Sequence, residues 1–200
     1  MAVLSSMEEP LGYAVGNSLE VQEAMDTLQG HGPADLTELC LTLSGQMIFL
    51  WPKGSHCRAR IPNGSIVAGT RCSMAKFEQL VNAQGGNLAQ GLPQAQHQFV
   101  VCAPQSGVVS GIDAKAIGHC SMLLGAGRES KGAAIDLSAG VLLQKKTNDV
   151  IKTGEPLAIL YYNTAYQQRA QEAALVLQQA YQIGNGPVQQ SPLVWKTIQD

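Results

Sequence analysis

This chain has no large excess of charge of either sign, since its 13 Lys and Arg and 15 Asp and Glu residues give a formal net charge of -2. Proteins that bind nucleic acid usually carry a basic surface, so nucleic acid is an unfavoured partner. No apolar run approaches the roughly 20 residues that a membrane-spanning helix needs. Residues 1–15 contain no cationic segment followed by an apolar core of the secretory type. We therefore expect a cytoplasmic protein that has no membrane partner.

Paired cysteine motifs are also absent. The five cysteines lie far apart, and no CxxC pair or Cys/His knuckle occurs. Zinc sites and disulfide frameworks need ligands or partners at closer, repeated spacings. We therefore expect buried or half-buried thiols in a reducing compartment. The four histidines have no Cys or Asp partner at a spacing typical of a nucleophile or a metal site.

The chain does have enough apolar residues for a core, since 45% of its 200 residues are hydrophobic and 14% are charged. Such a composition is typical of a globular protein with one large domain or two small ones. Apolar spacings near 3.6 predict helices over 18–28 and 34–50, and a third helix that starts near Met74. The short apolar run 2–4 predicts a buried strand, and the Pro and Gly residues of 52–72 interrupt any long element.

After residue 97 the pattern becomes that of a β-rich module. Short apolar runs alternate with Gly, Asn and Asp turn signals, as in compact sheets. A segment rich in Ala, Gln and Leu then predicts a helix over 164–182, and residues 192–195 predict a short return strand. The domains that we expect are an α/β part (1–91), a linker (92–97), an α+β domain (98–184) and a tail (185–200).

Three stretches together resemble the C-terminal half of the thymidine and pyrimidine-nucleoside phosphorylases. The first is Met-Glu-Glu-Pro-Leu-Gly at 7–12, and the second is Gly-Pro-Ala-Asp-Leu at 32–36 with Ala-Gln-Gly-Gly at 83–86. The third is Leu-Gly-Ala-Gly-Arg at 124–128, followed by Lys146, Gly154 and Glu155. The resemblance covers about residues 10–183. It implies that 1–91 is the C-terminal remnant of the phosphorylase α/β domain, and that 98–184 is a barrel-sandwich-like α+β domain.

The resemblance also implies an activity, which is phosphorolysis of thymidine, uridine or deoxyuridine to the free base and a pentose 1-phosphate. In the family a Lys-His-Ser-Thr-Gly-Gly loop holds phosphate, and an Arg with a Ser-x-x-x-Lys segment holds the pyrimidine. None of these occurs in this chain. No catalytic or substrate-binding residue is therefore assigned, and we expect a truncated chain that is inactive alone. Phosphate and the nucleoside would bind only if an N-terminal half were supplied.

Two other interpretations stay open at this point. The chain could be a non-catalytic binding or regulatory module derived from the phosphorylase. It could instead be one half of a split enzyme, acting with a complementing N-terminal fragment or as a homodimer. The apolar strand near Val3 would leave an exposed edge in 1–91, so we expect that region to need a partner.

A cation site is implied in part by the resemblance. In the family, a monovalent cation such as potassium, or calcium, is bound by two backbone carbonyls and one carboxylate, which map onto Leu11, Ala14 and Glu23. Hard cations prefer oxygen ligands of this kind. The remaining ligands would belong to the absent phosphate loop, so the site is incomplete. Glu23 could equally be a solvated helix residue.

Overall fold

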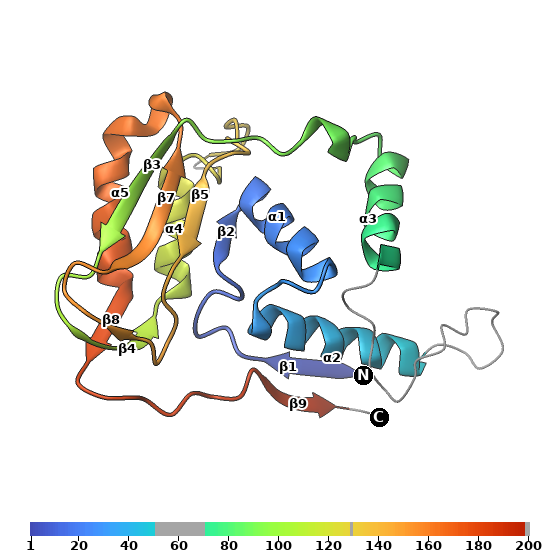
Figure 1. The fold of residues 1–200 in the computed structure, drawn as a ribbon, viewed down its shortest axis with the longest axis horizontal. Coiled ribbons are helices and arrows are strands. Elements are labelled where there is room, and N and C mark those ends of the chain that lie inside the picture. The colour runs from blue at the N-terminus through green and yellow to red at the C-terminus, as the bar shows by residue number, and fades with distance from the viewer. Residues whose placement is uncertain (51–70, 129, 199–200) are drawn as a thin grey trace.

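The computed structural model describes residues 1–50, 71–128 and 130–198. Within these residues the fold is mixed α/β, with three antiparallel sheets and no closed barrel (Figure 1). The predicted interruption at 52–72 lies almost wholly outside the described residues. No helix in the described part is long and apolar enough to cross a membrane. The helices are α1 (Asn17–Leu28), α2 (Ala34–Leu50), α3 (Arg71–Ala83), α4 (Ala114–Leu123) and α5 (Gln167–Ala180).

The strands form sheets with the orders β1-β9, β2-β5-β7-β3 and β6-β4-β8. All three sheets join segments far apart in the chain, because β1 pairs with β9, β2 with β5 and β4 with β8. The two chain ends therefore lie side by side in Figure 1. The strands are β1 (Ala2–Ser5), β2 (Ala14–Gly16), β3 (His97–Cys102), β4 (Gly107–Ile112), β5 (Gly140–Leu143), β6 (Val150–Ile151), β7 (Pro156–Tyr162), β8 (Tyr181–Gly184) and β9 (Val194–Ile198).

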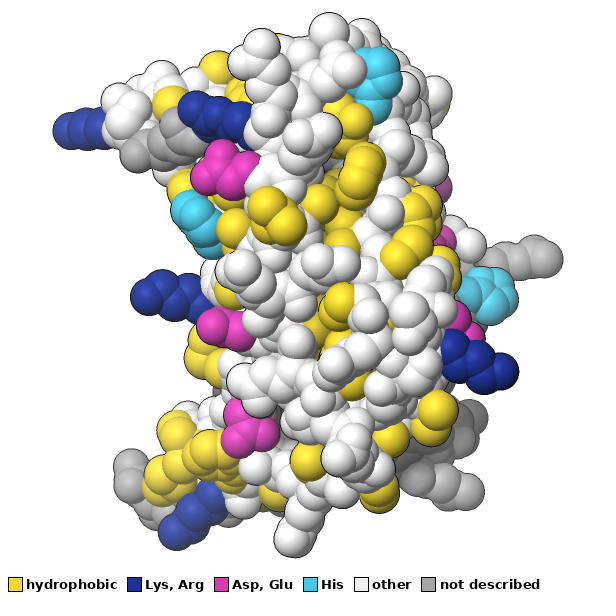
Figure 2. Space-filling view, turned by 90° about the vertical axis from the view of Figure 1, so that its left-hand side faces the viewer, with side chains coloured by type: hydrophobic (Ala, Val, Ile, Leu, Met, Phe, Trp, Pro, Cys, Tyr) yellow, Lys and Arg dark blue, Asp and Glu magenta, His cyan; other side chains and the backbone are white. Residues whose placement is uncertain are grey.

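The hydrophobic core lies between the four-stranded sheet and the helix pair α4 and α5. On β7, Leu157, Ala158 and Leu160 are fully buried. Helix α5 buries one stripe, made of alanines and Leu177 at spacings of three and four residues. On the face of the molecule seen in Figure 2, charged side chains of both signs lie apart from one another, with hydrophobic side chains exposed between them. Residues 97–184, called the C-terminal module below, therefore enclose most of the hydrophobic core.

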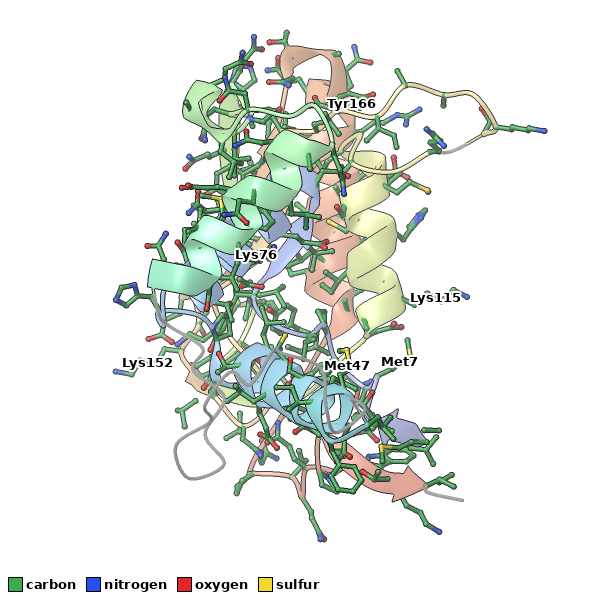
Figure 3. All side chains as sticks on the ribbon, turned by 90° about the vertical axis from the view of Figure 1, so that its right-hand side faces the viewer. Met7, Met47, Lys76, Lys115, Lys152 and Tyr166 are labelled. Carbon is green, nitrogen blue, oxygen red and sulfur yellow. The ribbon has the colours of Figure 1, made fainter. Side chains whose placement is uncertain are left out.

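Helix α2 differs, because none of its residues is buried. Met47 is 64% exposed and Phe49 is 73% exposed. Figure 3 looks onto this side of the molecule, with Met47 labelled on α2.

The prediction of buried or half-buried thiols fails at Cys40 on the same helix, since Cys40 is exposed while Cys102 is half-buried and Cys120 buried. The side chains of Cys57 and Cys72 lie outside the described residues.

The predicted helices over 18–28 and 34–50 are confirmed, and the helix predicted from Met74 is confirmed with an earlier start at Arg71. The return strand is confirmed as β9. The strand predicted at 2–4 is present as β1, but the prediction that it is buried is wrong. β1 is half-exposed and pairs only with β9, in a two-stranded sheet. The helix predicted over 164–182 is too long, since its last residues form β8 by pairing with β4. Strands β2 and β5 belong to one sheet although they lie on opposite sides of the predicted domain boundary at 92–97. That boundary stays a prediction.

Helix α1 begins without a side-chain N-cap. The capping position is Gly16, which has no side chain to accept a hydrogen bond. Its own backbone N–H donates to Glu20 Oε1 at 2.8 Å. The Glu20 side chain in the first turn thus accepts the hydrogen bond of the N-cap backbone N–H, as the glutamate of a capping box does.

Candidate functional site: the Pro-Leu-Gly loop

The loop before β2 is shaped by Gly12, whose φ of +68° favours glycine. A Cβ atom at this position would lie 2.1 Å from Glu23 Oε2. Glu23 comes from α1, and its Oε1 accepts hydrogen bonds from the backbone N–H groups of Tyr13 (2.8 Å) and Ala14 (3.1 Å). The glycine therefore lets the loop close directly over the Glu23 carboxylate.

Lys146 approaches the same loop from the turn that follows β5. Its Nζ donates to the carbonyls of Pro10 and Gly12, the latter at 3.0 Å. It also lies 3.5 Å from Glu9 Oε1 and 3.2 Å from Asp35 Oδ2. Only 12% of the Lys146 side chain is exposed. One ammonium group thus joins the loop, the first turn of α2 and the C-terminal module.

The two carboxylates around Lys146 are each fixed by further hydrogen bonds. Asp35 accepts from Gly12 N at 3.0 Å and from Leu36 N at 2.8 Å. Glu9 Oε2 accepts from the backbone N–H (3.1 Å) and the hydroxyl (2.7 Å) of Thr147. Both anions are therefore oriented by groups other than Lys146.

The pKa values of the carboxyl groups follow from these contacts. Burial acts to raise the pKa of Asp35, but the Lys146 charge and the two backbone N–H donors outweigh it, and the pKa lies below its ordinary value. Burial raises the pKa of Glu23, and the hydrogen bonds from Tyr13 and Ala14 only partly oppose that shift. Burial and nearby carboxylates raise the pKa of the Tyr13 phenol. Contact with Lys146 therefore favours the ionised form of Asp35, whereas burial disfavours the ionised form of Glu23.

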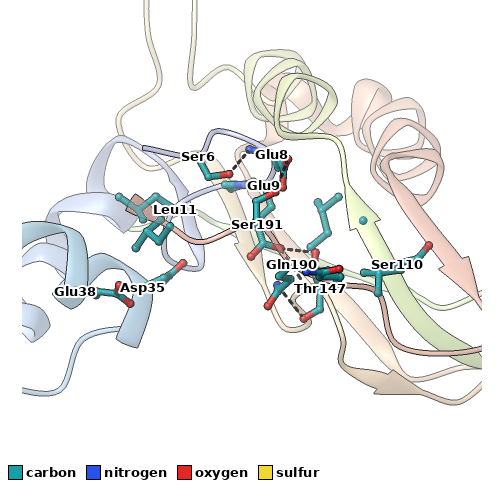
Figure 4. Close-up of a pocket in the computed structure, with 16 residues that line it drawn as sticks. Ser6, Glu8, Glu9, Leu11, Asp35, Glu38, Ser110, Thr147, Gln190 and Ser191 are labelled. Carbon is teal, nitrogen blue, oxygen red and sulfur yellow. Dashed lines mark hydrogen bonds between the residues drawn. The ribbon is translucent and has the colours of Figure 1, made fainter. Parts of the chain in front are cut away.

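A cavity of about 510 Å³ opens beside this network (Figure 4). Its wall includes the carboxylates of Glu8, Glu9, Asp35 and Glu38, and it contains no Lys, Arg or His among the described residues. The tail also lines the cavity, and its Ser191 hydroxyl donates to Glu8 Oε1 at 3.1 Å. Phosphate binding requires cationic or N–H donors, so this acidic cavity is unsuited to it.

The Leu-Gly-Ala-Gly-Arg stretch forms the loop after α4. Gly125 has φ +100°, and a Cβ there would lie 2.5 Å from the Tyr166 ring. Its carbonyl accepts from Asp136 N at 2.8 Å, and the next carbonyl, of Ala126, accepts from Asn17 Nδ2 at 2.9 Å. These contacts give the stretch a packing role between α1, α4 and the start of α5.

The three residues predicted to bind a cation lie together: Leu11 and Ala14 are in or next to the Pro-Leu-Gly loop, and Glu23 is on α1 beside it. The Glu23 carboxylate faces the loop, Ala14 is buried at the start of β2, and Leu11 is partly exposed. In the described residues no group of three or more His, Cys, Asp or Glu side chains has a metal-binding arrangement. The cation site stays a prediction. The Lys146 network was not predicted, and spacing gives little signal for it, because Lys146 lies 136 residues from Pro10.

Comparison with known proteins defines the class. Residues 108–184 match the family model described as the pyrimidine nucleoside phosphorylase C-terminal domain. In that region the chain is similar to nucleoside phosphorylase C-terminal domains, and its fold is mixed α/β. More particularly, it is homologous to the C-terminal part of the pyrimidine-nucleoside phosphorylases.

Three relatives carry that name. The Bacillus subtilis protein is 46% identical over 171 residues, which cover 82% of this chain and 39% of that protein. The Geobacillus stearothermophilus protein is 38% identical over 203 residues, covering 99% of this chain and 46% of that protein. The Staphylococcus haemolyticus protein is 44% identical over 170 residues, covering 82% and 39%. The chain therefore spans less than half the length of these relatives.

Proposed function

We propose that this chain provides the C-terminal part of a pyrimidine-nucleoside phosphorylase and is inactive alone. The reaction would be phosphorolysis of thymidine, uridine or deoxyuridine to the free base and a pentose 1-phosphate. The observation that carries the proposal is the 46% identity to a pyrimidine-nucleoside phosphorylase over 82% of this chain. The acidic wall of the 510 Å³ cavity supports the second half of the proposal, because it offers no cationic donor to a phosphate.

The exposed face of α2 supports a requirement for further polypeptide. Leu43, Met47 and Leu50 lie at spacings of four and three residues on one side of this helix and are exposed, as are Ile48 and Phe49. Contiguous apolar surface of this kind is unusual on an isolated domain and is typical of a surface that another segment covers. We propose that polypeptide equivalent to the N-terminal part of the relatives covers it, whether in the same chain or as a separate fragment.

The finer architecture belongs to the same proposal. Residues 1–91 would be the C-terminal remnant of the α/β domain, with a linker at 92–97 and a tail at 185–200. Residues 98–184 would be the barrel-sandwich-like domain. Potassium or calcium would bind the carbonyls of Leu11 and Ala14 and the carboxylate of Glu23, completed by ligands from the N-terminal part. The position of Glu23 directly under the loop supports this assignment.

The proposal is tested by phosphate-dependent release of thymine from thymidine. The purified chain is assayed alone, then with a recombinant N-terminal fragment of the Bacillus subtilis relative, and the fragment is assayed alone as the control. We expect release only from the mixture. Turnover by the chain alone would show that it is not inactive. A mixture that forms a complex without turnover would favour the alternative of a non-catalytic binding or regulatory module.

A further inference from the structure

We propose that Lys146 is a positioning residue whose ammonium group acts as the built-in cation of an oxygen cage, and that the cage binds a small free cation when the ammonium is removed. The cage atoms are the carbonyls of Pro10 and Gly12, Glu9 Oε1 and Asp35 Oδ2. These are the oxygen types that hard cations prefer. The cage shares none of these atoms with the expected cation site at Leu11, Ala14 and Glu23, and its existence does not depend on the proposed function.

The cage is fixed independently of its occupant. Thr147 holds Glu9 through its N–H and its hydroxyl, while the backbone N–H groups of Gly12 and Leu36 hold Asp35. The positive φ of Gly12 sets the turn that brings its own carbonyl and that of Pro10 to the same nitrogen. Loss of the ammonium would therefore leave four oriented oxygens facing one point.

The charge balance of the cage also requires a cation. Two partly buried carboxylates, 23% and 28% exposed, face one ammonium. The ammonium also lies 5.7 Å from the centroid of the Tyr13 ring, whose face attracts positive charge. An empty cage would place the two carboxylates against carbonyl oxygens with no compensating charge, which is unfavourable away from bulk water.

Lys145 provides a matched control in the adjacent position. Its ammonium lies 3.5 Å from Glu155 Oε2, with side chains 24% and 38% exposed. Both residues of that pair lie in the segment between β5 and β7, and the pair does not involve the Pro-Leu-Gly loop. Exposed pairs of this type contribute little to stability. A change at Lys145 removes the same charge from the chain but leaves the cage intact.

The test uses the full chain with Lys146→Ala, which opens space in the cage, and Lys146→Met, which fills most of that space with an apolar side chain. Lys145→Ala is the control. Thermal unfolding and amide hydrogen exchange are measured in ammonium, potassium or choline chloride at equal ionic strength. We expect Lys146→Ala to unfold several degrees higher in ammonium or potassium chloride than in choline chloride. The unsubstituted chain, Lys146→Met and Lys145→Ala should show no such difference.

Hydrogen exchange provides the positional readout. The amides of Gly12, Tyr13 and Ala14 should exchange at least ten times faster in both Lys146 variants, and ammonium should restore protection in Lys146→Ala alone. If Lys146→Ala does not fold in choline chloride, ammonium chloride should recover folded protein. Equal behaviour of Lys146→Ala in all three salts, failure to fold in every salt, or unchanged exchange at these amides would each overturn the proposal.

Discussion

Helices α2 and α5 differ in how their apolar residues are used. Helix α5 carries a narrow apolar stripe, and Ala170, Ala173 and Leu177 within it are buried against the core. Helix α2 is the more apolar of the two in mean hydropathy but buries no residue. A sequence rich in apolar residues therefore does not by itself give a closed core. The difference indicates that the apolar stripe of α5 is covered by the core, whereas α2 presents an uncovered surface.

The largest expected effect comes from opening a cavity in the module. Leu160 on β7 is fully buried, so Leu160→Ala should lower the free energy of unfolding by about 2–5 kcal/mol. Phe49→Ala on α2 removes a larger side chain that is 73% exposed, and it should change stability by less than about 0.5 kcal/mol. Urea unfolding of the two variants measures the contrast. Similar losses in both would mean that α2 contributes to the same core.

A second, smaller effect concerns the polar contacts inside the module. The Tyr181 hydroxyl lies 3.0 Å from the Lys145 carbonyl and 3.1 Å from that of Leu157, and burial raises the pKa of this phenol. Tyr181→Phe would remove the hydroxyl donor from the Lys145 carbonyl, whereas the Leu157 carbonyl would keep the hydrogen bond from the Gln144 backbone N–H at 2.8 Å. We expect a loss of about 1–2 kcal/mol in the free energy of unfolding, measured in urea. Tyr161→Phe, at a half-exposed tyrosine of β7, serves as the control and should cost less.

The smallest effect is expected at Asp136, where a turn of the module meets solvent. Burial acts to raise its pKa, but hydrogen bonds from Ser138, Asn163 and Ala139 outweigh it, so the pKa lies below the ordinary value of 3.8. The folded form therefore binds the proton more weakly than the unfolded form. The resulting stability is present above pH 3.8 and is lost as the pH falls through the folded pKa.

Asp136→Asn tests this sign. We expect the variant to be less stable than the unsubstituted chain by under about 1 kcal/mol near neutral pH, since the carboxylate is only partly buried. The gap should shrink as the pH falls below 3.8. Thermal unfolding between pH 3 and pH 7 measures it, with Asp26→Asn on α1 as the control. A gap that grows on acidification would contradict the account.

Much of the fold was predictable from local pattern. The helices α1 and α2 and the strands β5 and β7 follow from apolar spacing, because each places its pattern within a short window. Helix α4 was not predicted, although Asp113 gives a capping signal and accepts hydrogen bonds from Lys115 N and Ala116 N. Its glycine and its short length hide the helical period.

The rest depends on contacts between distant segments. β8 replaces the end of the predicted helix because Tyr181 pairs with Ile112 of β4, a tertiary contact that overrides local propensity. The Lys146 network has the same origin, since Glu9 and Asp35 come from the other end of the chain. The resemblance to the phosphorylases indicated which residues belong to the shared stretches. It did not indicate which of them meet.

The most direct test of the account asks whether the proposed activity needs the exposed apolar surface of α2. Phosphate-dependent release of thymine is measured for the N-terminal fragment of the Bacillus subtilis relative mixed either with the unsubstituted chain or with a chain carrying Met47→Lys and Phe49→Lys. Both substituted residues are exposed, so the fold should be unchanged. The account predicts release from the first mixture, at least ten times less from the second, and none from the chain alone. Equal release from the two mixtures, or release by the chain alone, would contradict it.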